Sequence, residues 1–201
     1  IKYDYETPNV YFYISNIQKQ QGDTAAAVAT LKNGIENHPE ENNAMIIELI
    51  NYYLGAQKTD EALEYLKIAI EKDTTNASLY FATGTIYDQT ERKDKALEFY
   101  EKALEIDPDH FNSLYNTGAI YYNKAGDLIA EAQELPLDAK EEYQQKLDKA
   151  KEYFKKALPY MEKAHELKPE DQETMLSLKE MYHRLKMYDK RNEIQKKLKG
   201  E

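Results

Sequence analysis

The sequence predicts an all-α solenoid, a stack of antiparallel helix pairs, over the whole chain of 201 residues. Tyr53, Tyr87 and Tyr121 recur at a constant interval of about 34 residues. Small residues repeat in the same register as Gly84 and Gly118, Ala62 and Ala96, and Ala69 and Ala103. A fixed period of about 20 to 50 residues is typical of stacked supersecondary units. The small positions let two helices approach closely, and the large ones fill the space between successive pairs.

Two helix pairs are predicted before residue 77. The first covers about residues 8–42, and its markers are Gly22, Asp23, Ala27, Leu31, Gly34 and Pro39. The second covers residues 43–76 and carries Tyr53, Ala62, Leu66 and Ala69. Ile50 stands there at the glycine position and Thr74 replaces the closing proline, so the first helix of this pair is the least typical.

The third pair, residues 77–110, carries the pattern in full. Its markers are Tyr80, Gly84, Tyr87, Ala96, Tyr100, Ala103 and Pro108. This order of large, small and aromatic residues resembles the tetratricopeptide repeat (TPR) family, and the whole chain is similar in style to bacterial multi-repeat TPR proteins. The resemblance covers nearly all of the chain and implies a single right-handed TPR α-solenoid over residues 1–201.

The fourth pair, residues 111–171, contains an insertion at about residues 120–156. Its two small positions, Gly118 and Ala157, lie more than three times as far apart as Gly84 and Ala96 in the third pair. Compared with the regular repeat, roughly 27 residues are extra. Apolar residues at spacings of three and four predict two facing seams, namely Ala125, Leu128, Ala132 and Leu135, and Tyr143, Leu147, Ala150 and Phe154. We therefore expect a helical-hairpin spur, longer than a normal pair by roughly 20 Å.

Two local features predict how the returning helix of this hairpin runs. Asp138, followed by Glu141, predicts its start, because an aspartate can accept a hydrogen bond from an unpaired backbone N–H. Pro159 lacks the N–H that would bond back to Lys155, so we expect a kink or restart near residues 156–158.

The two ends of the chain differ. Residues 172–199 predict two polar amphipathic helices, which we interpret as a C-terminal capping hairpin. No cap is evident at the other end. Ile1 is not a start methionine and the chain opens almost directly into a repeat, so we expect that a preceding segment has been removed.

Composition excludes several classes of partner and site. A formal net charge of −10 argues against nucleic acid, because phosphate binding needs a basic surface. No apolar run approaches the roughly 20 residues of a membrane span. The absence of cysteine excludes disulfides and thiol chemistry. Both a cytoplasmic location and export to the periplasm or cell envelope stay open.

No catalytic, metal or cofactor site is predicted. The four histidines, His38, His110, His165 and His183, lack zinc-ligand spacing and are interpreted as ordinary surface residues. A glycine-rich phosphate loop, a calcium loop and a nucleophile elbow are all missing from the sequence. We therefore expect a non-catalytic protein without a cofactor.

The TPR resemblance implies a binding surface. In that family the first helix of each pair lines a concave groove that holds an extended peptide or a partner helix. Carried onto this sequence, the groove residues are Phe12, Asn16, Asn51, Phe81, Thr85, Asp88, Asn112, Tyr115, Tyr122 and Asn123. Rings supply rigid apolar area, and amides can bond backbone groups in either direction. The alternative is that Phe81, Tyr115 and Tyr122 only pack against adjacent helices.

The charge of these inner positions limits the kinds of partner that we expect. TPR proteins that hold the acidic C-terminal tails of heat-shock chaperones use a clamp of Lys, Arg and Asn. No Lys or Arg occupies the inner positions of the second to fourth pairs, which argues against a chaperone tail and favours a neutral or basic protein segment. Two other functions stay open: a structural or self-assembly module that uses the spur or the uncapped N-terminal face, and an accessory region of a longer protein.

Overall fold

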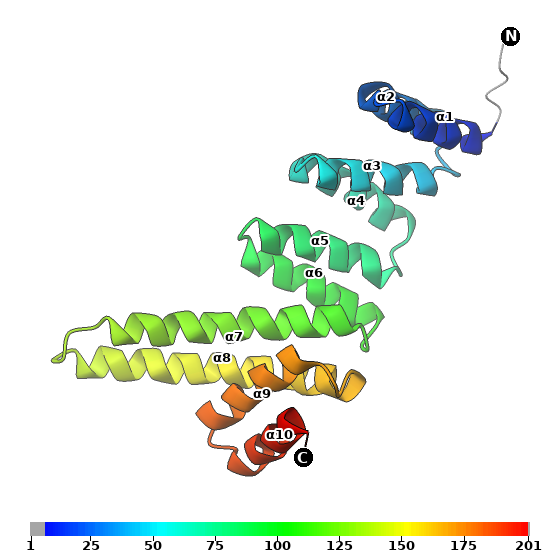
Figure 1. The fold of residues 1–201 in the computed structure, drawn as a ribbon. Coiled ribbons are helices and arrows are strands. Elements are labelled where there is room, and N and C mark those ends of the chain that lie inside the picture. Colours follow the sequence, from blue (N-terminus) through cyan, green and yellow to red (C-terminus); the bar gives the residue numbers. More distant parts are fainter. Residues whose placement is uncertain (1–6, 201) are drawn as a thin grey trace, which may run out of the picture. The chain divides into compact units, whose positions relative to one another are not determined.

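The structure, a computed structural model, describes residues 7–200. Within these residues it contains ten α-helices and no strand (Figure 1). The chain separates into two compact units, the first ending at Ile86 and the second starting at Tyr87. Helix α5 (Ala77–Gln89) begins in the first unit and ends in the second. Ile1, on which the expectation of a preceding segment rests, lies outside the described residues.

The first unit contains two helical hairpins and the start of α5. Its helices are α1 (Pro8–Gln20), α2 (Thr24–Asn37), α3 (Asn43–Gly55) and α4 (Thr59–Lys72). Pro8 lies in the first turn of α1, where a missing N–H costs nothing. The Asp23 carboxylate accepts a hydrogen bond from the Ala26 N–H at 2.9 Å and so caps α2. Gly22, in the turn before it, has a φ of +81°, which favours glycine.

One apolar cluster holds the first unit together. It joins α1 to α5 through Tyr11, Leu31, Met45, Ile46, Leu49, Ile50, Tyr53, Ala62, Leu66 and Ile86. Gly34 of α2 lies against this cluster, and a Cβ atom there would come within 2.7 Å of the Tyr11 Cβ and would also meet Met45. The position that usually carries alanine is therefore too crowded for alanine here, and glycine allows the close packing of α2.

The second unit contains one unusually long hairpin. Its helices are α6 (Lys93–Ile106), α7 (Phe111–Gln133), α8 (Lys140–Leu167), α9 (Gln172–Arg184) and α10 (Tyr188–Lys199). Helices α7 and α8 have 23 and 28 residues, against 13 for α5 and 14 for α6. They lie side by side along their length and are joined by a short turn (Figure 1). The extra residues of this pair thus lengthen both arms, and α8 more than α7.

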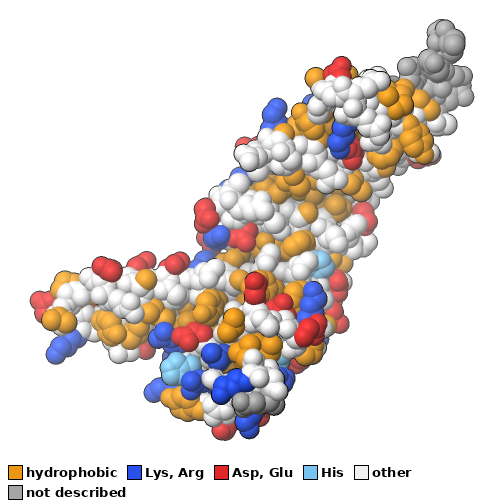
Figure 2. Space-filling view, viewed as in Figure 1, with side chains coloured by type: hydrophobic (Ala, Val, Ile, Leu, Met, Phe, Trp, Pro, Cys, Tyr) orange, Lys and Arg blue, Asp and Glu red, His pale blue; other side chains and the backbone are white. Residues whose placement is uncertain are grey.

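The core of the second unit lies where the long hairpin meets the C-terminal helices. Phe154 and Met161 of α8 are buried there with Leu178 of α9 and Ile194 of α10. Gly118 of α7 faces Met161, and a Cβ at Gly118 would lie 2.8 Å from the Met161 Cγ. Over α9 and α10, Lys and Arg side chains lie beside acidic ones on the face shown in Figure 2.

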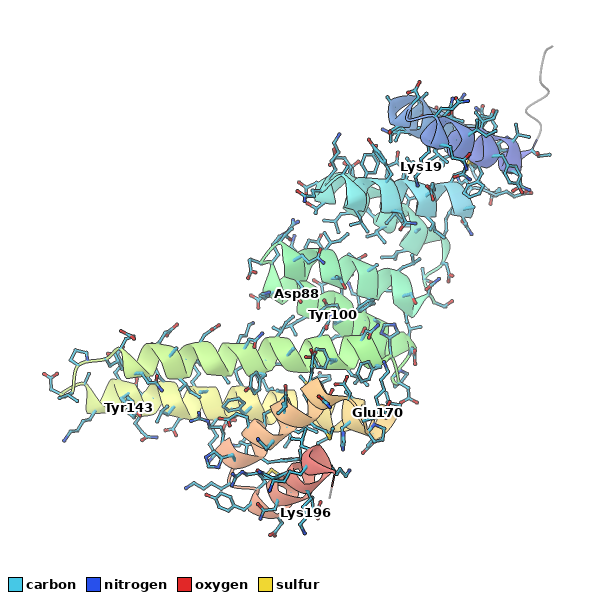
Figure 3. The ribbon with its side chains drawn as sticks, viewed as in Figure 1. Lys19, Asp88, Tyr100, Tyr143, Glu170 and Lys196 are labelled. Carbon is cyan, nitrogen blue, oxygen red and sulfur yellow. The ribbon has the colours of Figure 1, made fainter. Side chains whose placement is uncertain are left out.

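Seam residues of the long hairpin become more exposed toward its tip. Ala125, Ala132 and Ala150 are fully buried, whereas Tyr143 is 43% exposed and lies near the tip (Figure 3). Leu135 falls in the connection after α7 and is half-buried, although the pattern placed it on the helix. The seam therefore packs tightly over most of the hairpin and loosens at its end.

The predicted start of the returning helix is wrong. Asp138 does not cap α8: the helix begins at Lys140, with Ala139 as its N-cap residue and no side-chain cap. The chain turns earlier, since the Ala139 N–H donates to the Pro136 carbonyl.

The restart expected near residues 156–158 does not occur, because α8 runs as one helix through Pro159. The kink expected there stays a prediction. Pro159 and Lys155 are both exposed, so water can bond the carbonyl that loses its donor, while buried Ala157 and Met161 hold the opposite face.

Candidate peptide-binding surface

The groove residues predicted in the first unit have different environments. Phe12 of α1 packs against the core cluster, and its ring meets Tyr13 edge-on at 6.0 Å. Asn16, one turn further along α1, is half-buried, and Asn51 of α3 is exposed. The Asn51 side chain is thus available to a ligand, whereas the Phe12 side chain contributes to the core of the first unit.

The predicted residues of α5 bond within the protein. The Thr85 hydroxyl donates to the Phe81 carbonyl at 3.0 Å, one turn back on the same helix. Asp88 Oδ1 lies 2.7 Å from the Nζ of Lys93, the first residue of α6. Its other oxygen lies 3.5 Å from the hydroxyl of Tyr100, which is fully buried in α6.

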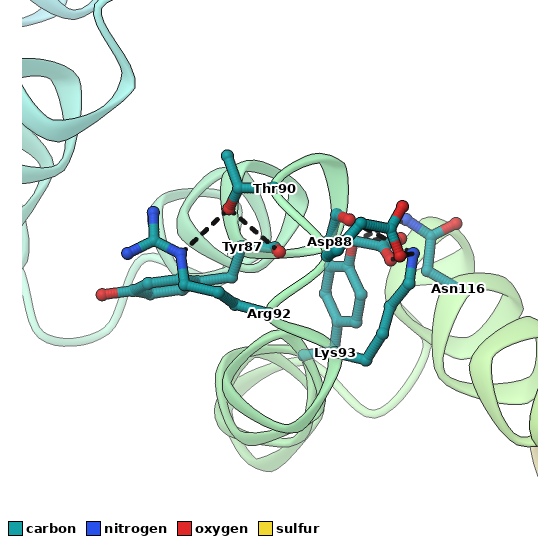
Figure 4. A network of polar contacts seen from close by, with 8 residues as sticks. Tyr87, Asp88, Thr90, Arg92, Lys93 and Asn116 are labelled. Carbon is teal, nitrogen blue, oxygen red and sulfur yellow. Dashed lines mark hydrogen bonds and ion pairs between the residues drawn. The ribbon is translucent and has the colours of Figure 1, made fainter.

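Tyr100 connects this ion pair to α7. Figure 4 shows Asp88 and Lys93 of the ion pair, with Asn116 of α7 beside them. The Tyr100 hydroxyl donates to Asp88 and accepts a hydrogen bond from the Asn116 Nδ2 at 3.0 Å. A buried tyrosine needs a partner for its hydroxyl, and here it has one on each side. Asp88 therefore helps to join α5, α6 and α7. The sequence marked Tyr100 only as a large core residue, and a tyrosine in a slot that holds leucine in the second pair is the signal that could have shown the network.

Tyr115, on α7, packs toward α9. Its ring stacks on Phe111 at 6.3 Å, and its hydroxyl donates to the Glu173 carboxylate at 3.0 Å. Burial, together with that carboxylate, raises the pKa of Tyr115 to about 12, so the hydroxyl stays protonated at neutral pH. Asn112 and Asn123, on the same helix, are exposed.

Among the predicted groove residues, Tyr122 lines a hollow in the second unit. The hollow has a volume of about 270 Å³ and lies where the long hairpin meets α9. It is lined by Tyr122, Gly126, Ile129, Ala130 and Gln133 of α7, Phe154 of α8, and Glu180 and Arg184 of α9. We call it the hairpin hollow.

The hairpin hollow has an apolar wall and a polar side. The rings of Tyr122 and Phe154 meet edge-on at 5.5 Å. Opposite them, the Arg184 Nε lies 2.6 Å from the Glu180 Oε1, one helical turn away. The two charges offset each other, and the Tyr122 hydroxyl makes no hydrogen bond among the described residues. Such a site can take an apolar side chain and offer a hydroxyl, an amide and a guanidinium to a peptide backbone.

Sequence reasoning missed most of the hairpin hollow. Gly126, Ile129, Ala130 and Gln133 belong to the lengthened part of α7, after Asn123, the last groove position that we carried over from the TPR pattern. Glu180 and Arg184 come from the predicted cap, which we did not expect to take part in the groove. The length of the insertion could have indicated this hollow, because a longer first helix also has a longer inner face.

The histidines are less uniform than expected. His110 caps α7, since its Nδ1 accepts from the Ser113 N–H at 3.3 Å. His38 packs edge-on against Tyr11, and its Nε2 is buried without a partner. His165 lies on α8 and contacts Lys197 of α10, and burial and then Lys197 lower its pKa. His38 and His165 are therefore partly buried, each with one ring nitrogen that is buried and unpaired among the described residues.

Two further features of the described residues bear on the site. Among residues 7–200, no three His, Asp or Glu side chains gather as they would around a metal ion. None of the described helices combines the length and the apolar character that a membrane crossing requires.

Family models recognise most of the repeat pattern. Three tetratricopeptide-repeat models match the chain, at residues 9–40, 47–111 and 99–134. The matched segments include the glycine and tyrosine positions that define the period of the repeat. No curated protein sequence matches the chain.

Among the solved structures with the same fold, three proteins align with nearly the whole chain. A crystal structure of MamA protein is 21% identical, with 96% of this chain and 90% of that one covered and a TM-score of 0.64. A protein from Bacteroides ovatus described as protein-binding is 19% identical, covering 96% and 99%, with a TM-score of 0.59.

The third is YrrB, described as a TPR protein with an unusual peptide-binding site. It is 18% identical, covering 96% and 88%, with a TM-score of 0.58. At such identities the likeness concerns the fold. Together with the family models and the helical hairpins, it shows that the chain belongs to the tetratricopeptide-repeat family and has its all-α solenoid fold.

Proposed function

We propose that the protein is a non-catalytic scaffold that binds a segment of a partner protein on the inner face of its first helices. The observation that carries this proposal is the hairpin hollow, because it combines a predicted groove residue, Tyr122, with an open apolar wall and unused hydrogen-bond donors. An apolar side chain of the partner would enter the hollow, and Gln133 and Arg184 would bond its backbone.

Two proteins with the same fold support a role in binding. One is called protein-binding, and YrrB is said to have an unusual peptide-binding site. In this chain Asn112 and Asn123 are exposed on α7, where they would extend the contact beyond the hollow. The neutral ion pair in the hollow fits the expectation of a neutral or basic segment.

A blocked hollow tests the proposal. Random 12-residue peptides are selected on the native protein by display, and the enriched peptides are titrated against Ala130→Trp. Ala130 is exposed, so the indole fills the hollow without removing a packed side chain. The matched control is Leu137→Trp at the hairpin tip, where Leu137 is 97% exposed.

We expect Ala130→Trp to weaken the selected peptides at least about 10-fold and Leu137→Trp to leave them unchanged, because only the first indole occupies the site. Circular dichroism checks that both variants fold. Equal affinity for the native protein and the folded Ala130→Trp variant, or no enriched peptide at all, would show that the hollow is not the binding site.

A further inference from the structure

A different face of α8 carries alternating lysines and tyrosines. The residues are Lys149, Tyr153, Lys156, Tyr160 and Lys163, at spacings of four, three, four and three. Because these spacings return to one side of a helix, the five side chains form a single stripe, which we call the lysine–tyrosine stripe. It is roughly 20 Å long and contains no acidic residue.

The tyrosines of the stripe are fixed by stacking. Tyr121 of α7 lies beneath both of them, 6.2 Å from Tyr153 and 6.3 Å from Tyr160, with nearly parallel rings. Burial and then Glu101 of α6 raise the pKa of Tyr121 and of Tyr160, so both hydroxyls stay neutral. The three rings therefore form a rigid apolar base rather than mobile surface side chains.

The lysines stand over this base. The Lys156 Nζ lies 5.5 Å from the centre of the Tyr153 ring and 5.9 Å from that of Tyr121. Lys156 is exposed and has no carboxylate within ion-pair distance among residues 7–200. The Lys163 Nζ pairs with Asp109 at 2.9 Å, but Asp109 is 63% exposed, so this pair is weak.

Beside the stripe lies a second hollow, of about 490 Å³. It is lined by Leu114, Tyr121, Lys156, Pro159, Tyr160 and Lys163. Its wall is apolar and two lysines stand at its rim. The stripe carries three lysines in a protein whose formal net charge is −10. The carboxylates beside it are Asp109, which pairs with Lys163, and Glu101 of α6, near Tyr121 and Tyr160. A surface that combines local positive charge with an apolar hollow is complementary to an acidic segment that carries a large apolar side chain.

We propose that the lysine–tyrosine stripe is a second binding surface, separate from the hairpin hollow, that takes an acidic segment of a partner protein. Carboxylates of the segment pair with the three lysines, and an apolar side chain enters the hollow beside Tyr160. The stripe spans about six residues of extended chain. The two surfaces thus differ in the charge of the partner that they select.

The probe is a fluorescein-labelled 12-residue peptide of glutamates with two phenylalanines, compared with the same peptide made of glutamines. Binding is followed by fluorescence anisotropy to the native protein and to Lys156→Glu/Lys163→Glu. The control is Lys151→Glu/Lys155→Glu, which changes the net charge equally on the same helix but off the stripe.

We expect the native protein to prefer the glutamate peptide at least about 10-fold, the stripe variant to lose that preference, and the control to keep most of it. Ala130→Trp should bind the peptide as the native protein does. The proposal is overturned by equal losses in the stripe variant and the control, by loss in Ala130→Trp, or by no preference for glutamate.

Two other occupants of the stripe are separable by further measurements. The first measurement uses vesicles that contain phosphatidylserine. If the native protein binds them more tightly than it binds the peptide, and the stripe variant does not bind them, the stripe is a membrane-binding surface instead. Sedimentation that shows a dimer of the native protein, broken by Lys156→Glu/Lys163→Glu, would assign it to a second copy of the chain. Either result overturns the proposal, and a monomer that ignores the vesicles supports it.

Discussion

The hairpins α3–α4 and α7–α8 fill the space between their two helices in different ways. Ile50 of α3 and Gly118 of α7 occupy the same place in the repeat, and the residues in the corresponding slot of the second helices are Leu66 and Met161. Ile50 and Leu66 are both buried, as two large side chains in one core cluster. Gly118 instead leaves its space to Met161, whose Cγ would lie 2.8 Å from an added Cβ. What each hairpin preserves is a filled interior rather than a particular residue.

The largest effect should come from removing the bulk in α3. Ile50→Gly should lower the free energy of unfolding by about 4 kcal/mol, because it leaves a cavity beside Leu66 and places a glycine within a helix. Urea denaturation followed by circular dichroism measures the change.

The control for this change lies in the same helix. Ile47 is 51% exposed, so Ile47→Gly should cost only about 1 kcal/mol, from helix propensity alone. Equal costs for the two substitutions would mean that Ile50 does not fill the interior of the hairpin.

The converse change adds bulk to α7. Gly118→Ile should lower the free energy of unfolding by about 2 kcal/mol, because the side chain would overlap that of Met161. Combining it with Met161→Ala should recover part of the loss, since the two positions share one space. Denaturation of the two single variants and the double variant forms the test, and strict additivity would contradict the shared space.

Tyr100 occupies the same repeat position as Leu66 and Met161. Its ring fills space as their side chains do, and its hydroxyl also makes hydrogen bonds. Tyr100→Phe keeps the ring and should cost about 1.5 kcal/mol, because Asn116 loses an acceptor and Asp88 a donor. Tyr143→Phe, at the exposed hairpin tip, should leave thermal and urea denaturation unchanged. Should Tyr100→Phe be equally silent, the network would contribute nothing to stability.

The smallest effect concerns Gly126, the second glycine of α7. A Cβ at Gly126 would meet nothing within 4 Å, so Gly126→Ala should raise the free energy of unfolding by roughly 0.5 to 1 kcal/mol through helix propensity. A rise in the thermal midpoint is the expected readout. A fall would indicate a contact that the space around Gly126 does not suggest.

The repeat pattern predicted the helices well because its signals are local. Small and large residues three, four and seven positions apart decide which helix faces can meet, and every hairpin contains both members of such a contact. The prediction that Asp138 caps α8 was wrong because Asp138 lies inside a turn from Pro136 to Ala139. The helix therefore begins after Ala139, one residue later than predicted. Turn geometry of this kind depends on how the two long helices approach each other.

The candidate sites were harder to predict because they join distant segments. Arg184 reaches the hairpin hollow from α9, a different helix from the one that carries Tyr122, and no spacing in the sequence records that contact. The same holds for Tyr121, which stacks beneath the lysine–tyrosine stripe across the insertion. The lysines and tyrosines of the stripe are visible in the sequence, but their function depends on the ring below them.

The long hairpin also has a consequence for the order in which the protein folds. Near its tip, Glu131 and Lys146 form an ion pair at 2.7 Å and are close to each other along the chain as well. The short loop between them closes on the order of 100 ns, far faster than contacts between distant segments form. We therefore expect folding of the second unit to nucleate at the tip of the α7–α8 hairpin and to advance toward its base. The capping helices α9 and α10 would then dock on a hairpin that is already formed.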